Sequence, residues 1–89
     1  AAPFVVFPQV LKNVRVLDKE SAQNNPAVQK AVQEVTEALG NDGRILLRAS
    51  GTEPLVRVMV EADTEEKCER YVDQVITVMN KEGLVLTVQ

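Results

Sequence analysis

Histidine and tryptophan are absent from this sequence, cysteine occurs once, at Cys68, and aromatic residues make up only 3% of its 89 residues. A single cysteine cannot form an internal disulfide, and without histidine or a second cysteine it cannot build a zinc site. A reducing compartment fits this composition, so we expect a cytoplasmic protein. The scarcity of aromatics leaves few platforms on which nucleobases or sugar rings could stack.

Positive charge is also scarce, because 13 acidic residues outnumber 10 basic ones and give a net charge of −3. Nucleic-acid binding draws most of its affinity from a basic surface, so no nucleic-acid partner is expected. No apolar run approaches the length that spans a bilayer, and the first ten residues do not resemble a signal peptide. We therefore expect no membrane partner, and any anion site must be confined to a few residues.

The apolar pattern predicts one small folded domain. Alternation predicts strands over residues 9–17, 44–49, 55–62 and 84–88. One amphipathic helix is predicted from Pro26 to Gly40, and a second, with Cys68 on its buried side, from Thr64 to Gly83. The order β-α-β-β-α-β predicts an α+β two-layer sandwich, in which a four-stranded, mostly antiparallel sheet carries two helices on one face. Its other face is rich in valine and leucine, which suggests a neighbour.

A short loop between two predicted strands separates two arginines, in the segment RASGTEPLVR over residues 48–57. If the hairpin is symmetric about Thr52 and Glu53, Arg48 and Arg57 form a cross-strand pair on one face of the sheet. Like charges placed directly opposite each other destabilise a sheet. Their pairing here suggests that an anion lies between them, and the planar fork of arginine suits a phosphate.

The loop itself offers further donors for a phosphate. Ser50 and Thr52 add hydroxyl groups, and Gly51 lets backbone N–H groups approach an oxygen without an intervening side chain. Pro54 keeps Glu53 out of helical geometry and so shapes the loop.

The same residues also have an ordinary structural explanation. Loops rich in Ser, Gly, Thr and Pro are common turns, and exposed arginines beside them often pair with carboxylates such as Glu53 or Glu61. Spacing alone leaves both interpretations open.

A resemblance to a known family favours the first interpretation. The segment RILLRASGTEPLVRVMVEA, residues 44–62, resembles the signature of the C-terminal domain of the α-D-phosphohexomutases. Within that family, the segment FPQVLKNVRV, residues 7–16, with the acidic helix after it, is most similar to the phosphoglucosamine mutases. The resemblance extends over nearly the whole chain from Phe7 onwards.

The resemblance implies which residues bind the ligand. In the family, the arginine, serine and threonine of the motif hold the phosphate of a sugar phosphate, and they correspond here to Arg48, Ser50 and Thr52. Gly51 corresponds to a backbone contact. Arg57 follows at the family spacing and either joins the phosphate site or pairs with a carboxylate.

The resemblance also implies what lies elsewhere. Family enzymes use a phosphorylated serine and a Mg²⁺ ion held by an aspartate cluster, and the present sequence has neither a serine in a nucleophile context nor an Asp-x-Asp-x-Asp run. Residues 9–89 are expected to be a C-terminal phosphate-binding domain without a cofactor of its own, and residues 1–8 a remnant of an interdomain connection. Its partners would be a sugar phosphate and the remaining domains of the enzyme, and the domain alone would be inactive.

A second hypothesis from another class stays open. A free-standing ferredoxin-like ligand-binding or regulatory module would use its open sheet face for association. A reading frame that continues upstream would support the enzyme fragment, and the missing initiator methionine favours it. RNA binding on the sheet is disfavoured by the acidic composition and the lack of aromatics.

Overall fold

The computed structural model describes residues 7–88. The predicted interdomain remnant over residues 1–8 therefore lies almost entirely outside the described residues. Within the described part, no helix is both long and apolar enough to cross a membrane.

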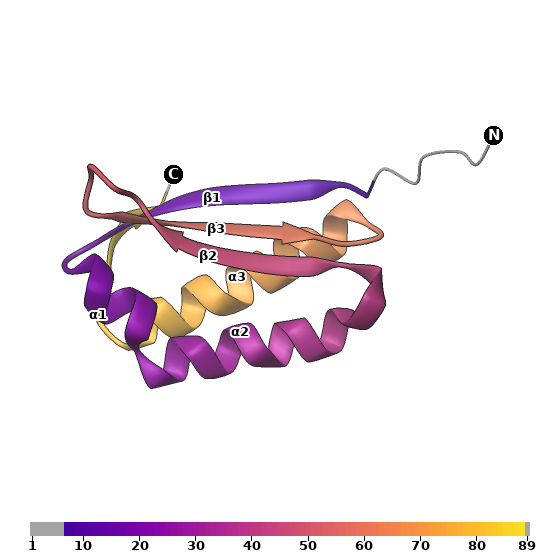
Figure 1. Cartoon of the computed structure of the whole chain (residues 1–89), viewed down its shortest axis with the longest axis horizontal. Coiled ribbons are helices and arrows are strands. Elements are labelled where there is room, and N and C mark those ends of the chain that lie inside the picture. Colours follow the sequence, from indigo (N-terminus) through magenta and orange to yellow (C-terminus); the bar gives the residue numbers. More distant parts are fainter. Residues whose placement is uncertain (1–6, 89) are drawn as a thin grey trace.

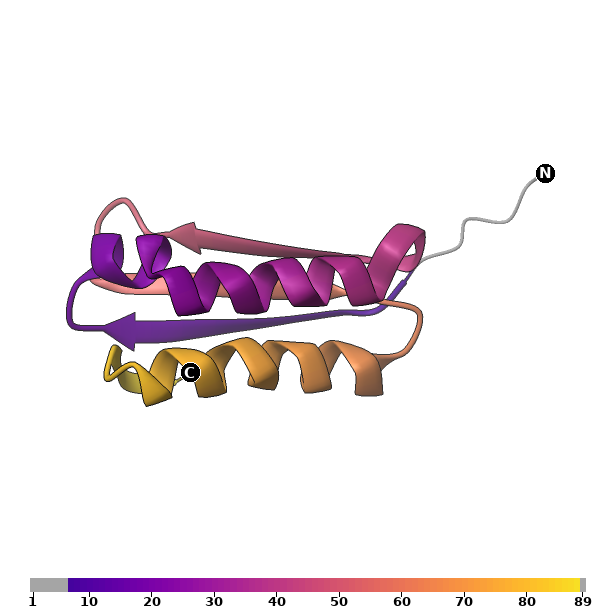
Figure 2. The ribbon, with the colours of Figure 1, turned by 90° about the horizontal axis from the view of Figure 1, so that it is seen from below.

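The predicted two-layer α+β sandwich is confirmed. Neighbouring strands pair antiparallel in the order β2-β3-β1-β4, and the helices cover one face of the sheet (Figures 1 and 2). In chain order the elements of residues 7–88 are β1 (Gln9–Val16), α1 (Lys19–Asn24), α2 (Pro26–Leu39), a 3-10 turn (Gly40–Asp42), β2 (Arg44–Ala49), β3 (Leu55–Glu61), α3 (Glu65–Lys81) and β4 (Val85–Val88).

The helix α1 was not predicted, so the helical layer has one more member than expected. Asp18 begins it by accepting hydrogen bonds from the Glu20 amide at 3.1 Å and from the Ser21 hydroxyl at 3.0 Å. Its one buried residue, Ala22, packs into the core with no exposed surface. Six residues are too few to show a helical period in the sequence, and burial against the sheet stabilises a helix this short.

The two long helices begin and end where the sequence predicts. Asn25 caps α2, because its Oδ1 accepts hydrogen bonds from the backbone of Ala27 at 2.8 Å and Val28 at 3.2 Å. Gly40 ends α2 with φ 56°, a conformation that favours glycine. Thr64 caps α3 by the same chemistry.

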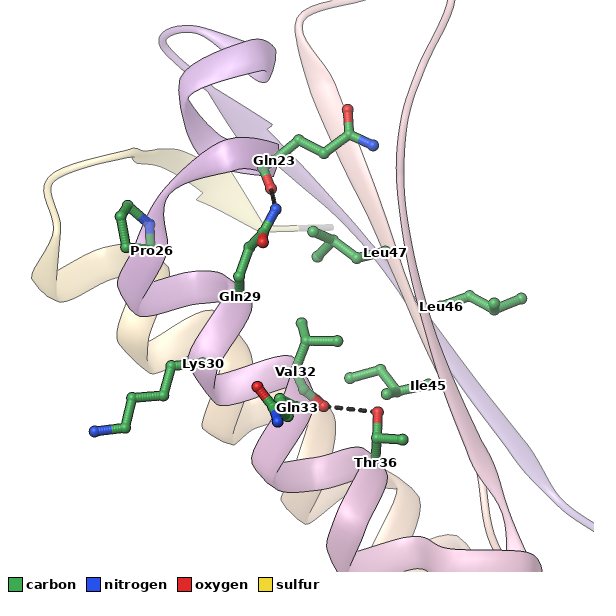
Figure 3. A pocket seen from close by; sticks show the side chains of 10 residues that line it. All are labelled: Gln23, Pro26, Gln29, Lys30, Val32, Gln33, Thr36, Ile45, Leu46 and Leu47. Atoms are coloured by element: carbon green, nitrogen blue, oxygen red, sulfur yellow. Dashed lines mark hydrogen bonds between the residues drawn. The ribbon is translucent and has the colours of Figure 1, made fainter.

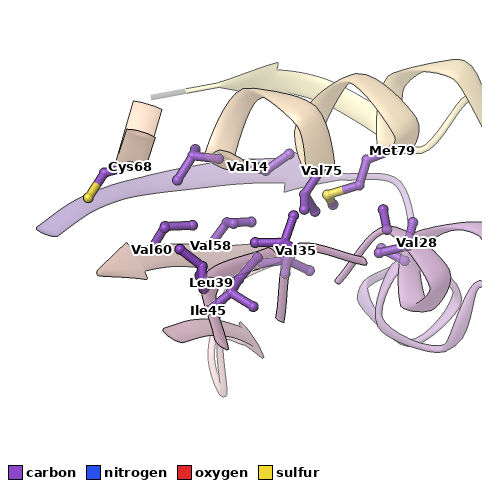
Figure 4. Packing of buried hydrophobic residues seen from close by; sticks show 14 of the residues in the cluster. Val14, Val28, Val35, Leu39, Ile45, Val58, Val60, Cys68, Val75 and Met79 are labelled. Atoms are coloured by element: carbon purple, nitrogen blue, oxygen red, sulfur yellow. The ribbon is translucent and has the colours of Figure 1, made fainter. Parts of the chain in front are cut away.

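The core lies between the sheet and the helices and consists mainly of small aliphatic side chains (Figure 4). Cys68 is fully buried in it, and its Sγ donates to the Pro8 carbonyl oxygen at 3.2 Å. Burial raises the pKa of the Cys68 thiol, so the thiol stays protonated near neutral pH. The predicted position of Cys68 on the buried side of its helix is confirmed. Central members of the core are Val14, Val35, Val56, Val58, Val60, Val72, Val75 and Met79.

The other face of the sheet carries no helix in the described residues, as the sequence predicted. The register aligns Leu46, Met59 and Leu11 in one row across β2, β3 and β1. Leu46 is 36% exposed and Leu11 is 49% exposed, so this row forms an apolar band. Toward the loop between β2 and β3, the next row contains Arg48 opposite Arg57.

Candidate functional site

The β2–β3 hairpin has the register that the sequence predicts, with Arg48 directly opposite Arg57. Their neighbours Leu47 and Val58 point toward the helices and pack in or against the core. Because side chains alternate along a strand, the two arginines leave the opposite, open face. Both arginines are exposed and lie at the base of the loop.

The loop is held by one contact within the hairpin and by two contacts from segments that are distant in sequence. The Ser50 amide donates to the Leu55 carbonyl at 2.9 Å and closes the hairpin. The Val16 amide at the end of β1 donates to the Pro54 carbonyl at 3.0 Å. From α1, the Lys19 ammonium donates to the Ser50 carbonyl. The last two contacts could not be predicted from the sequence, because they join the loop to segments that become neighbours only in the folded chain.

The Ser50 hydroxyl accepts from the backbone amides of Thr52 at 3.4 Å and Glu53 at 3.3 Å. A hydroxyl has two lone pairs and one donor, so these long contacts occupy its acceptor side. The O–H group remains available to donate. Ser50 is thereby suited to contact an anion.

The two arginines differ in what they contact. Arg57 donates from Nε to the Asn13 Oδ1 at 3.3 Å, which is a neutral partner on β1. Arg48 makes no side-chain hydrogen bond or ion pair within residues 7–88. Glu61, a carboxylate that the sequence offered as a partner, bonds instead to Arg44 at 3.0 Å. In the described part of the chain, neither arginine at the loop is neutralised by a carboxylate.

A hollow of about 270 Å³ lies at the base of the loop and is lined by Arg48, Ala49, Ser50, Gly51, Leu55 and Arg57. It thus brings together four of the five predicted site residues. The fifth, Thr52, does not line it, and its backbone amide points to Ser50 Oγ. A Cβ added to Gly51 would meet nothing within 4 Å, so the backbone here is open to a ligand.

A larger groove of about 750 Å³ lies between α2 and the edge strand β2 (Figure 3). Two of its polar side chains bond to backbone carbonyls: Gln29 donates to the Gln23 carbonyl at 3.1 Å, and Thr36 donates to the Val32 carbonyl at 2.8 Å. Lys30, the charged residue of its lining, points away from β2 in Figure 3. The groove therefore offers an anion less charge than the smaller hollow does, which two arginines line.

The described residues do not fit a metal ion. Among residues 7–88 there is no group of three histidine, cysteine, aspartate or glutamate side chains that could hold one. The chemistry of the hollow is that of an anion site, because its polar side chains are two arginines and one hydroxyl.

Comparison with known proteins bears on this site. Residues 11–78 match the family described as phosphoglucomutase/phosphomannomutase, C-terminal domain. Over 83 residues the chain is 63% identical to the phosphoglucosamine mutase of Lachnospira eligens, which covers 93% of this chain and 18% of that protein. Over 81 residues it is 56% identical to the phosphoglucosamine mutase of Oceanobacillus iheyensis, and this match covers 91% of this chain and 18% of that protein. The chain thus spans about a fifth of the length of these relatives.

Solved structures agree with the fold. The N-acetylphosphoglucosamine mutase of Aspergillus fumigatus in complex with glucose 1,6-bisphosphate superimposes with a TM-score of 0.72 at 26% identity, over 86% of this chain and 16% of that one. Another structure of that protein contains GlcNAc-6P and magnesium. A dimeric ferredoxin-like protein from an uncultured marine organism superimposes with a TM-score of 0.56 at 14% identity, over 94% of this chain and 83% of that one, a likeness of fold alone.

Proposed function

Because the chain belongs to the phosphoglucomutase/phosphomannomutase family as its C-terminal domain, we propose that it is the phosphate-recognition domain of a phosphoglucosamine mutase. The observation that carries this proposal is the pair Arg48 and Arg57, which lie directly opposite each other across β2 and β3 and line one small hollow, with no carboxylate partner among residues 7–88. In our proposal a phosphate group of the substrate supplies the missing negative charge. Ser50 and Gly51 add a hydroxyl and a backbone donor from the lining of the hollow, and in the proposal Thr52 adds its hydroxyl from outside that lining.

The contribution of this domain to catalysis would be positioning. A guanidinium group is not a general base, and among residues 7–88 no carboxylate lines the hollow. The domain would hold the phosphate that does not react while the other phosphate is exchanged on a different domain. Fixing the distal end of a substrate in this way aligns its reacting end.

A site that binds only the phosphate group of its ligand suits an enzyme that interconverts glucosamine 6-phosphate and glucosamine 1-phosphate. Either end of the bisphosphate intermediate must occupy the site in turn, and the hollow is lined by groups that recognise phosphate rather than a sugar ring. The residues for the phosphoserine and Mg²⁺ would lie on the remaining domains, which are then partners of residues 9–89. Residues 1–8 would belong to the connection with those domains, and the enzyme would work in the cytoplasm.

The 89-residue chain alone is expected to show no mutase activity, because its sequence has no serine in a nucleophile context and residues 7–88 contain no group of three possible metal ligands. A coupled assay with glucosamine 6-phosphate and Mg²⁺ would measure this, with an intact phosphoglucosamine mutase as the positive control. Turnover by the purified chain above that of a blank without enzyme would contradict the assignment of catalysis to other domains.

Phosphate is expected to bind the chain weakly, with a dissociation constant of roughly millimolar, because a few charge-assisted hydrogen bonds must offset the cost of association. Titration with inorganic phosphate followed by ¹⁵N NMR should move the amide signals of residues 48–57 and leave those of α2 and α3 unchanged. The shifts should weaken as sodium chloride is added, since the site is exposed to solvent. Shifts centred on the helices would refute the proposed site.

A further inference from the structure

We infer that Lys19 is a positioning residue of the phosphate loop, an inference that rests on the proposed function. Its ammonium donates to the carbonyl oxygen of Ser50, which lines the hollow. Lys19 is half-buried and makes no ion pair within residues 7–88, so its charge is directed to a neutral carbonyl of the loop. A lysine whose function was solubility alone would be expected to extend into water.

The geometry of the peptide bond gives this contact a consequence. The Ser50 carbonyl and the Gly51 amide belong to one trans peptide unit, in which C=O and N–H point in opposite directions. Lys19 comes from α1, in the helical layer, and fixes the carbonyl toward that side. The Gly51 N–H is thereby turned toward the open face, which also carries Arg48 and Arg57.

The Gly51 amide is available to a ligand in this orientation. It donates no hydrogen bond to another group among residues 7–88, whereas the next two amides of the loop, of Thr52 and Glu53, point to Ser50 Oγ. A free backbone N–H beside two arginines is a donor that an anion can use. Lys19 does not line the hollow, but it thus orients the Gly51 N–H as a donor within it.

Lys19 is held in place by its own helix. Asp18 caps α1, and Ala22 anchors the helix in the core with no exposed surface. The helix contacts both strands of the hairpin that carries the loop, β2 and β3. An ammonium group mounted on a packed helix can select one orientation of a loop peptide, which a lysine on a mobile segment could not do.

The test compares three variants of the 89-residue chain with the unsubstituted chain by ¹⁵N NMR. Lys19→Met removes the charge and the donor, and Lys19→Arg keeps both. Lys30→Met removes the same charge from an exposed lysine of α2 that has no hydrogen-bond or ion-pair partner in the described residues. Two quantities are measured: the Gly51 amide shift and order without ligand, and the affinity for inorganic phosphate at fixed ionic strength.

In Lys19→Met we expect the Gly51 amide signal to shift and the amide to become less ordered. Phosphate affinity should fall about tenfold, because the Gly51 N–H would no longer be held in place for a charge-assisted hydrogen bond to the phosphate. Lys19→Arg should restore both quantities, and Lys30→Met should change affinity less than twofold. Equal losses in Lys19→Met and Lys30→Met, or an unchanged Gly51 amide in Lys19→Met, would overturn the inference while leaving the phosphate site intact. If phosphate moves no loop signal in the unsubstituted chain, the proposed function itself fails and the inference falls with it.

Discussion

Replacing Gly43 with alanine is expected to lower the free energy of unfolding by about 3 kcal/mol, the upper part of the usual range for overpacking. The new Cβ would lie 2.2 Å from the carbonyl oxygen of Glu61, and 3.1 Å from both Ala62 Cα and Leu39 Cδ2. Two of these three atoms are backbone, so the clash cannot be relieved by turning a side chain. Relief would require β2 and β3 to move apart where Arg44 pairs with Glu61.

The matched control for this experiment is Gly51→Ala. A Cβ at Gly51 would meet nothing within 4 Å, and its backbone does not have positive φ, so its stability should change by less than about 0.5 kcal/mol. Urea denaturation of both variants would give the two free energies. Equal stability of the Gly43 and Gly51 variants would show that the strand ends separate more easily than the packing indicates.

Arg48→Ala is expected to remove phosphate binding while leaving the fold intact. Arg48 is exposed and has no hydrogen-bond or ion-pair partner in the described residues, so its loss should destabilise the fold little. The anion site, in contrast, would lose one of its two guanidinium groups. Affinity for phosphate should fall at least tenfold in the NMR titration. In an intact phosphoglucosamine mutase that carries the same substitution, turnover should fall about 100-fold, because a misplaced distal phosphate misaligns the reacting one.

Arg44→Ala is the matched control, since it removes the same charge from the same face of β2. Arg44 bonds to Glu61 at the other end of the hairpin and lies outside the hollow. Its loss should leave phosphate affinity within about twofold of that of the unsubstituted chain, because salt screens most of the long-range attraction between Arg44 and the phosphate. Similar losses in both variants would mean that the net charge of the sheet, rather than a built site, attracts the anion.

The sequence by itself determined the features that depend on neighbouring residues. Helix ends could be predicted because the chemistry of a cap acts within a turn, as Asn25 and Thr64 show. The opposition of Arg48 and Arg57 could be predicted because a short hairpin fixes its own register. The motif around the loop pointed to the family for the same reason, since its residues are contiguous.

Contacts between distant segments were decided only in the tertiary structure. Glu61 stood in the sequence as a possible partner of the loop arginines, but the register places it opposite Arg44. Arg57 contacts Asn13, 44 residues away, because the strand order puts β1 beside β3. Local periodicity says which face a residue occupies, but it does not say which strand lies beside that residue.

Of these features, the contact between α1 and the loop is the hardest to predict from the sequence pattern. Lys19 reaches Ser50 because a six-residue helix buries Ala22 in the core and contacts both strands of the hairpin. Such a helix gains little stability from its own propensity and forms because its tertiary contacts bury it. The residues of the anion site could therefore be predicted from one contiguous motif. The orientation of the site's backbone donors depends instead on packing between segments that meet only when the chain has folded.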